Sequence, residues 1–579
     1  MEGKRELSSP QISHQSPGQK ILRYNLSKLA QAQINLSATA TPERYRLINC
    51  VNYISHYALS IHEFTDIKLV SYIAISYIWK GNISSPDESD EARNMTFTVV
   101  GGEDGDPVSI SVLHDACKVA LLEGIEWLWL DCLCIIQTDC TDKSWQIKHM
   151  YDIYRYYRIS VVLPGGLSRL VPIDEETKWI TRAWTLQEAE WEGGIQGEVG
   201  EVSCGVSAIV LLHQLLKACH YSQALTWTPD DGSGERDDLS PCVLGDYGNA
   251  GVGAPLWALA ATDPEERAMA LWQSSMLRAS SRPVDMVFSI MGFFGVTVEP
   301  RQFDSQDRIG ATIALAQGIP RKGGKPVWLG LSLDIRPSPF LSSFADFPVT
   351  DVTGNVRWAQ RRGPLQPNVS DSIYDIEWLN EEIDDGTESQ AEDVASVSLP
   401  QYWLTDLPPA TMDNDGYLII SSKAARIVPT GQIFGRRRTN LMKNNDYITL
   451  ELADAAPDNV TRVVGTDGRV WDIIPDSTGP GVPSNDVELD PVTAYMVVVG
   501  VSKKFPLDPV YQPDPRPVGG ILLDEMSTIR ACAVEEHRPG KFHRSSTFLL
   551  EAGRFQNILD QWPVISISIG RPEEYESKN

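Results

Sequence analysis

A strand-like apolar run in the first third of the chain contains residues whose types could do chemistry. The run is WLWLDCLCIIQ, residues 127–137, and it places Asp131 beside the cysteines Cys132 and Cys134. Zinc modules usually separate paired cysteines by about two to four residues. On a strand, Cys132 and Cys134 would instead point to one face with Leu133 opposite. We therefore interpret the cysteines as small core residues and expect no metal site.

Polar side chains stand at the ends of two predicted strands. The strand YIAISYIW begins at Tyr72 and carries Ser76, Tyr77 and Trp79 toward its end. Asp131 closes the second strand, where an ionised carboxylate needs a partner or solvent. Open α/β sheets bind ligands at the carboxyl ends of their strands. Ser76, Tyr77, Trp79 and Asp131 are therefore ligand-pocket candidates. The competing interpretation is that alternate strand residues simply pack.

Several common catalytic signatures do not occur in the sequence. There is no Gly-x4-Gly-Lys-Ser/Thr phosphate loop, no Gly-x-Gly-x-x-Gly after a strand, no His-Glu-x-x-His and no Gly-x-Ser-x-Gly. We therefore do not expect a P-loop nucleotidase, a dinucleotide-type oxidoreductase or one of the common hydrolases.

Helices are predicted between the strands of this part of the chain. One begins at Ser109 or Ser111 and ends at Gly124, and Thr141 caps the next, whose apolar side chains repeat with helical spacing. A buried strand, ISVVL, and a helical segment around KWITRAWTLQEAEW follow. Near-continuous apolar strands that alternate with helices indicate a parallel sheet covered on both faces, an open α/β fold.

Composition divides the chain into five regions. Residues 1–40 are rich in Ser, Gln and Pro and are predicted to be a flexible tail, and 41–200 form the α/β domain. Residues 201–300 are predicted to be a helical extension, and 301–400 an irregular region with an acidic linker. Short β-type runs then predict a β-rich C-terminal domain over 401–572: GYLIISS, YITLELA, RVWDII, AYMVVVGV, GGILL and ISISIG.

Charge, cysteine usage and hydropathy limit the possible partners. The formal net charge of −27 argues against nucleic acid or an anionic membrane surface as the main partner. Nine cysteines scattered over 579 residues are unlike a disulfide framework. The sequence contains no signal peptide and no apolar run of membrane-spanning length. We expect a cytoplasmic protein with reduced thiols, no membrane span and no nucleic-acid partner.

Three motifs in the same order resemble the fungal heterokaryon-incompatibility (HET) domain. They are YIAISYIW at 72–79, WLDCLCIIQ at 129–137 followed by DKSWQIKHMYDIY at 142–154, and RAWTLQE at 182–188. The resemblance covers roughly residues 45–200. Farther along, SRPVDMVFSIMGFFGV is similar to a segment often found downstream in such proteins.

The sequence departs from the HET pattern at two positions. Lys80 follows Trp79 where the family usually has Gly, although Gly81 comes next. Ile136 precedes Gln137 where the family usually has Asn. No role is carried over to Ile136, because an apolar side chain there replaces a polar one.

The resemblance implies a fold and a biological role. HET domains are regarded as distant relatives of Toll/interleukin-receptor (TIR) domains, which have an open flavodoxin-like parallel sheet and signal by assembly. The implied role is that of an intracellular effector in fungal self/non-self recognition and programmed cell death, a form of innate immunity. Such an effector would act through protein partners and through homo-oligomers formed on activation. In this scheme the C-terminal domain is a possible sensor and the HET domain its output.

The resemblance also leaves an enzymatic alternative open. Some TIR domains cleave NAD with a carboxylate in a Trp-Cys-x-x-Glu pattern on a helix, and Trp184-Thr-Leu-Gln-Glu188 has that spacing with Thr185 in place of Cys. Residues i and i+4 share a helix face, so Trp184 would line a pocket beside a catalytic Glu188. NAD would be a substrate and no cofactor would be required. A structural interpretation competes, since Thr185-x-x-Glu188 also fits a capping box.

Overall fold

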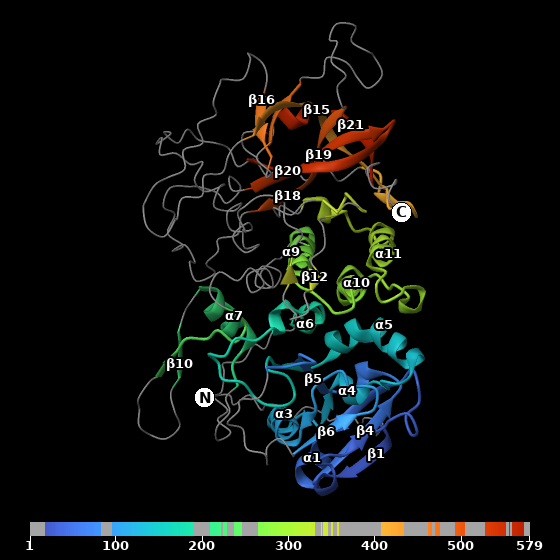
Figure 1. The fold of residues 1–579 in the computed structure, drawn as a ribbon, viewed down its shortest axis with the longest axis vertical. Helices are drawn as coiled ribbons and strands as arrows, with labels where there is room; N and C mark the ends of the chain where they lie inside the picture. Colours follow the sequence, from blue (N-terminus) through green and yellow to red (C-terminus); the bar gives the residue numbers. More distant parts are fainter. Residues whose placement is uncertain are drawn as a thin grey trace, which may run out of the picture. The chain divides into compact units, whose positions relative to one another are not determined.

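The computed structural model divides the chain into two compact units, and the chain passes between them more than once (Figure 1). The first unit comprises Met1–Trp179, Gln187–Leu212 and Thr226–Leu244, and the second comprises Ile180–Leu186, His213–Leu225 and Gly245–Asn579. The structure describes residues 18–82, 95–189, 209–221, 224–227, 237–245, 264–330, 337–338, 340–344, 349–350, 356–357, 407–433, 461–465, 469–474, 493–503, 527–551, 555 and 558–571.

The core of the first unit is a six-stranded sheet with the order β1-β4-β3-β8-β5-β9. Its strands are β1 (Gln19–Asn25), β3 (Tyr45–Asn49), β4 (Ala58–Phe64), β5 (Tyr72–Tyr77), β8 (Trp127–Trp129) and β9 (Ile159–Leu163). Strands β8, β5 and β9 run parallel, whereas β1, β4, β3 and β8 pair antiparallel in turn. The prediction of a parallel sheet is therefore right for β8, β5 and β9 and wrong for β1, β4 and β3. Parallel pairing needs a crossover of about a dozen residues or more, which the short link from β3 to β4 does not supply.

The first strands also correct the predicted flexible tail over residues 1–40. In the described part of this region, β1 pairs with β4, and β2 (Gln33–Ile34) joins β6 (Thr96–Val99) and β7 (Val108–Ser109) in a small second sheet. Most side chains of β1 are exposed and the strand lies at an edge of the main sheet. Backbone hydrogen bonds hold it, so hydrophobic periodicity does not reveal it. The rest of the predicted tail, residues 1–17, lies outside the described residues.

Helices connect the strands of the first unit. They are α1 (Cys50–Ser55), α3 (Ile110–Leu122), α4 (Asp131–Cys134) and α5 (Cys140–Tyr156). Helix α6 (Ala183–Ala189) follows β9, and only its residues from Gln187 onward belong to this unit. Ser109 caps α3, as predicted, by accepting the N–H of Val112, and Gly124 follows in the left-handed region at φ +70°. The predicted cap of α5 at Thr141 is wrong. Asp139 caps this helix, because its carboxylate accepts the N–H of Thr141 at 2.7 Å.

The apolar run around β8 is not a strand throughout. The strand ends at Trp129, and Asp131–Cys134 forms a helical turn, so the predicted continuation to Cys134 is wrong. The turn is stabilised locally, because the Asp131 carboxylate accepts the N–H of Cys132 at 2.6 Å and such a bond competes with strand pairing. Cys132 and Cys134 are buried, as expected for core residues, and Asp131 still follows the carboxyl end of the strand.

A buried ion pair joins strand β3 to helix α5 in the first unit. Arg46 on β3 and Asp142 on α5 are both 0% exposed, and two hydrogen bonds of 2.9 Å join the guanidinium to the two carboxylate oxygens. Glu63 on β4 lies 3.3 Å from the same guanidinium. A charge is costly to bury without a partner, so each member of the pair depends on the other.

The Arg46–Asp142 pair also holds the backbone around it. The guanidinium donates to the carbonyl oxygens of Thr41 at 2.5 Å and Cys134 at 2.9 Å. The carboxylate accepts the N–H groups of Glu43 and Ile136, each at 2.8 Å. The segment before β3 and the segment after α4 are therefore fixed to one buried interaction.

The second unit contains a helical part. Its helices are α7 (Leu212–Tyr221), α9 (Pro264–Met276), α10 (Asp285–Met291) and α11 (Arg308–Arg321). The second unit also holds the short strands β12 (Val349–Thr350) and β13 (Val356–Arg357), whereas β10 (Leu225–Trp227) and β11 (Asp237–Leu239) belong, apart from Leu225, to the first unit. Helix α11 corrects the predicted irregular region over 301–400, and its cap is visible in the sequence, since Asp307 accepts the N–H of Gly310. The predicted acidic linker lies outside the described residues.

An eight-stranded sheet forms the β-rich C-terminal part of the second unit. Its strands are β14 (Thr411–Met412), β15 (Leu418–Ile433), β16 (Thr461–Val464), β17 (Arg469–Ile473), β18 (Ala494–Lys503), β19 (Ser527–Arg538), β20 (Lys541–Glu551) and β21 (Val564–Ile569). Pairings between β15, β18, β19, β20 and β21 return to β15, so these strands close into a ring.

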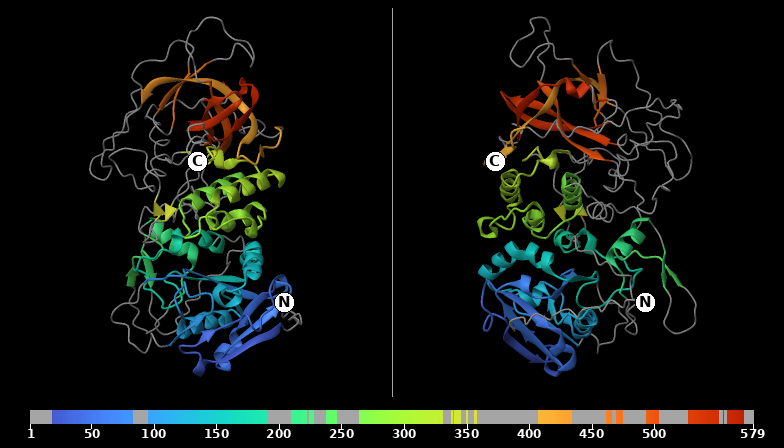
Figure 2. Two further views of the ribbon diagram at one scale, coloured as in Figure 1. Left: turned by 45° about the vertical axis from the view of Figure 1, so that its right-hand side comes forward. Right: turned by 180° about the vertical axis from the view of Figure 1, so that it is seen from behind.

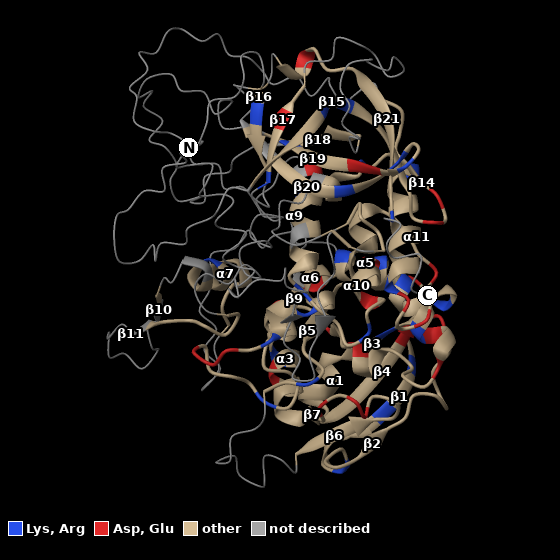
Figure 3. Cartoon of the chain, turned by 45° about the horizontal axis from the view of Figure 1, so that its top comes forward, with Lys and Arg blue, Asp and Glu red and all other residues tan. Residues whose placement is uncertain are grey.

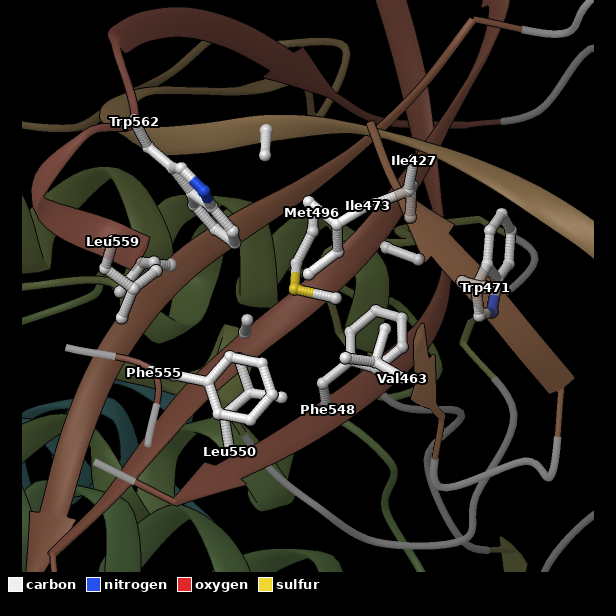
Figure 4. Close-up of a cluster of buried hydrophobic side chains, with 14 of the residues drawn as sticks. Ile427, Val463, Trp471, Ile473, Met496, Phe548, Leu550, Phe555, Leu559 and Trp562 are labelled. Carbon is white, nitrogen blue, oxygen red and sulfur yellow. The ribbon is translucent and has the colours of Figure 1, made fainter. Parts of the chain in front are cut away.

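The core of this sheet is a cluster of large apolar side chains. Figure 4 shows Trp471, Met496, Phe548 and Trp562 among them, contributed by strands and by the segment before β21. Four predicted runs lie on β15, β17, β18 and β21, whereas YITLELA and GGILL lie outside the described residues. The hairpin of β19 and β20 was missed, because charged residues interrupt its apolar pattern.

Charged side chains of both signs are interspersed along the described elements (Figure 3). Within the same residues, no helix has both the length and the apolar character needed to cross a bilayer.

We predict that Asp142→Asn destabilises the first unit by about 3–5 kcal/mol, because it leaves the Arg46 charge buried without its main partner. Urea unfolding followed by hydrogen exchange in β3 and β4 measures this change. The control is Asp115→Asn on α3, where the carboxylate is 36% exposed beside His114 and Lys118 and a change within about 0.5 kcal/mol is expected. Equal effects of the two substitutions would contradict the role of the ion pair.

Candidate functional site

The carboxyl ends of β5 and β8 are neighbours, because these strands pair in parallel. From β5 the chain crosses through α3 to β8, and from β8 it crosses back through α5 to β9 on the other side of β5. Right-handed crossovers in opposite directions place α3 and α5 on opposite faces of the sheet, as Figure 1 and Figure 2 show. Open α/β sheets bind ligands at such a switch point.

The Asp131 carboxylate holds two aromatic side chains from the end of β5. The hydroxyl of Tyr77 donates to Oδ1 at 2.5 Å, and the indole N–H of Trp79 donates to Oδ2 at 2.8 Å. The N–H of Cys132 also reaches Oδ1, and the side-chain amide of Gln137 donates to the backbone carbonyl of Asp131 at 3.0 Å. Both carboxylate oxygens are engaged by the protein, so Asp131 fixes the positions of Tyr77 and Trp79.

Ser76 points to the other face of β5, because neighbouring strand residues alternate in direction. It is fully buried, its oxygen accepts the indole N–H of Trp179 at 2.8 Å, and its hydroxyl donates to the Glu188 carboxylate. Trp179 is also fully buried, whereas Glu188 on α6 is partly exposed. The Glu188 carboxylate therefore lies at the carboxyl end of β5.

Tyr154 on α5 links the Asp131 group with the Glu188 group. The tyrosine is 4% exposed, and its hydroxyl donates to the carbonyl of Ile75 on β5 at 3.0 Å. Burial raises the pKa of the Tyr154 phenol well above its usual value of 10.0, and the charges of Glu188 and Asp131 raise it further. Both carboxylates thus act on the same protonated phenol.

The arrangement suits a ligand that carries hydroxyl groups or develops positive charge. Carboxylates accept hydrogen bonds from hydroxyls and stabilise positive charge, most strongly where water is excluded. The partly exposed Trp79 adds flat apolar surface. In the part of the chain that the structure describes, no three His, Cys, Asp or Glu side chains are grouped to hold a metal ion.

Trp184 is the one sequence candidate that makes a different contact. It lies on α6, whose first residues belong to the second unit, and its side chain hydrogen bonds to Asp285 at the start of α10. Burial raises the pKa of the Asp285 carboxyl, while Trp184, Arg282 and Arg182 counteract this rise. Ser76, Tyr77, Trp79, Asp131 and Glu188 are the candidates that the structure brings together around β5.

The structure does not contain the capping box that the sequence allows. Thr185 is inside α6 rather than at its cap, and its hydroxyl donates to the carbonyl of Arg182 at 2.8 Å. The Glu188 carboxylate contacts Ser76 instead.

Gly81 explains how the chain accommodates Lys80 after Trp79. A Cβ at position 81 would lie 1.9 Å from the carbonyl oxygen of Gly165, so only glycine lets the loops after β5 and β9 approach. The N–H of Gly81 also donates to the Asp106 carboxylate at 2.6 Å. The glycine that anchors the loop after Trp79 is thus at position 81, one residue later than in the family pattern.

Sequence reasoning missed two residues of the site. Tyr154 is one of several tyrosines on an apolar helical face, which is typical of core packing. Trp179 lies in a segment that has no strand or long helix, and nothing in the sequence pairs it with Ser76. Its only signal is a large aromatic residue close before the RAWTLQE motif.

Residues 72–169 match the family model described as heterokaryon incompatibility protein (HET). This segment is a HET domain. It runs from the start of β5 past the end of β9 and includes Asp131 and Tyr154, while Trp179 and Glu188 follow it. No curated protein and no solved structure matches the chain.

We predict that Asp131→Asn loosens the loop after β5, because the amide presents N–H groups where Trp79 or Tyr77 needs an acceptor. Hydrogen exchange of residues 78–82 should reveal a local loss of about 1–3 kcal/mol. In a Trp79→Phe background the same change should cost less, since one donor is already gone. Strict additivity of the two substitutions would contradict the hydrogen bond between these side chains.

Proposed function

We propose that this protein is an effector of fungal self/non-self recognition, which triggers programmed cell death in heterokaryon incompatibility. The observation that carries the proposal is the HET match over residues 72–169, whose strands form the parallel half of the sheet and carry the Asp131 end of the site. We place the effector in the cytoplasm, where the partner cells of a heterokaryon mix their proteins.

Association is the mechanism that we favour for this effector. The HET domain resembles TIR domains, which signal by assembly, and the HET match leaves more than 400 of the 579 residues available for partner recognition. In this proposal the active species is an oligomer of the chain, formed when a partner protein signals a mismatch.

We predict that cell killing tracks assembly. Expression in a fungal host at graded levels should show a threshold in killing, because oligomers form steeply with concentration. Light scattering on the purified chain at matched concentrations measures the assembly. Potent killing by a chain that remains strictly monomeric would contradict the association mechanism.

An enzymatic output is the second candidate, and the position of Glu188 favours it. The carboxylate accepts the hydroxyl of Ser76 at the carboxyl end of β5, beside the buried phenol of Tyr154. The reaction would be NAD hydrolysis. Water adds to the anomeric carbon of the ribose, the bond to nicotinamide breaks, neutral nicotinamide leaves with the bonding pair, and one proton is released.

The role of Glu188 in this reaction would be electrostatic. Breaking the bond between nicotinamide and ribose develops positive charge on the sugar, as in glycoside hydrolysis. A carboxylate near the ring stabilises that charge or accepts a ribose hydroxyl. Trp79, which is partly exposed and is held by Asp131, would supply an aromatic wall.

We predict that Glu188→Gln lowers NAD loss by about 100-fold or more if the chain is an NAD hydrolase, because the substitution removes the charge and keeps the shape. Purified full-length protein at high concentration is the sample, and NAD is followed over time. The control is Glu175→Gln, since Glu175 is paired with Arg169 and should leave the rate unchanged. Killing that persists in Glu188→Gln while the protein folds and accumulates normally would remove the enzymatic candidate.

A further inference from the structure

The hydroxyl of Ser76 has a single orientation in this structure. A serine hydroxyl carries one proton and rotates unless a neighbour fixes it. Ser76 is 0% exposed, and the indole N–H of Trp179 donates to its oxygen at 2.8 Å. Since an indole N–H can only donate, the oxygen of Ser76 accepts there, and its one proton is directed to the Glu188 carboxylate.

We propose that Trp179 is a positioning residue, which acts through Ser76 to fix the orientation of the Glu188 carboxylate at the end of β5. The proposal rests on the function proposed above for Glu188. It adds a residue that lies after the HET match and that has no contact of its own with a ligand in this scheme.

Trp179 is itself held by a segment far along the chain. The backbone N–H of Trp179 contacts the hydroxyl oxygen of Thr177 at 3.5 Å, and that hydroxyl donates to the carbonyl of Val243 at 2.6 Å. The N–H groups of Cys242 and Val243 in turn donate to the carbonyl of Ile173, each at 3.0 Å. The chain around residue 243 therefore braces the turn that presents the indole.

Other buried tryptophans show that this indole contact is specific. The N–H groups of Trp129, Trp272, Trp328 and Trp471 are buried and have no acceptor among the described residues. Burial alone therefore does not bring an indole N–H to an acceptor in this protein. Trp129 is a matched control for Trp179, since it is 1% exposed, lies in the same unit and lacks the hydrogen bond.

The test measures the Glu188 side chain directly. A carbodiimide with a small amine labels accessible carboxylates, and mass spectrometry gives the labelling rate of Glu188 in the full-length chain. The variants are Trp179→Phe, Ser76→Ala, the double variant and Trp129→Phe. Glu175, paired with Arg169 in the same unit, is the internal reference.

The proposal makes three linked predictions for the labelling rate. Trp179→Phe and Ser76→Ala each raise the rate at Glu188 by about threefold to tenfold, which corresponds to the usual net contribution of one hydrogen bond. The double variant raises it no further than the larger single effect, because both substitutions break one chain of contacts. Trp129→Phe leaves it unchanged.

An unchanged rate in Trp179→Phe, or the same increase in Trp129→Phe, would overturn the proposal. If Trp179→Phe does not fold, Thr177→Val tests the same chain of contacts, because it removes the hydroxyl under the indole segment and keeps the tryptophan. A further outcome is that Trp179→Phe raises the labelling rate of Glu188 while NAD loss and cell killing are undiminished. Trp179 then positions Glu188 as proposed, and the function assigned to Glu188 is lost.

Discussion

Arg46 and Asp142 meet where four segments of the first unit converge: β3, the turn before it, the segment after α4 and the first turn of α5. Neither side chain is exposed, so the pair cannot be replaced by water if one member is lost. The same carboxylate and guanidinium also bind the backbone of Cys134, the last residue of the turn that begins with Asp131, and of Ile136 just after it. The position of the site therefore depends on an interaction that makes no contact with the site itself.

One strand end supplies two different environments. The hydroxyl of Tyr77 donates to the Asp131 carboxylate, which also accepts the N–H groups of Trp79 and Cys132, while the hydroxyl of Ser76, one residue earlier, donates to the Glu188 carboxylate. The HET match contains Ser76 and the whole Asp131 group but stops before Glu188, so the hydrogen bond between Ser76 and Glu188 extends beyond the matched segment.

Local patterns in the sequence predicted those helices and strands that are determined by interactions between neighbouring residues. Ser109 before an apolar helix, and the continuous apolar strands β5 and β9, were correctly assigned for this reason. The turn at Asp131 was not, because its carboxylate accepts the N–H of Cys132 together with the side-chain donors of Tyr77 and Trp79, which lie far away in the sequence. The contact between Trp179 and Ser76 joins residues 103 positions apart, and no periodicity encodes such a pair.

The ring of strands in the C-terminal part has a consequence for solubility. The ring closes through two residue pairs, Lys541 with Ser568 and Phe542 with Ile569, and the strands at two other edges of the sheet are short, the two-residue β14 and the four-residue β16. Short edges are poor templates for pairing with another chain. The short strands β14 and β16 therefore disfavour pairing with another chain at those two edges of the sheet.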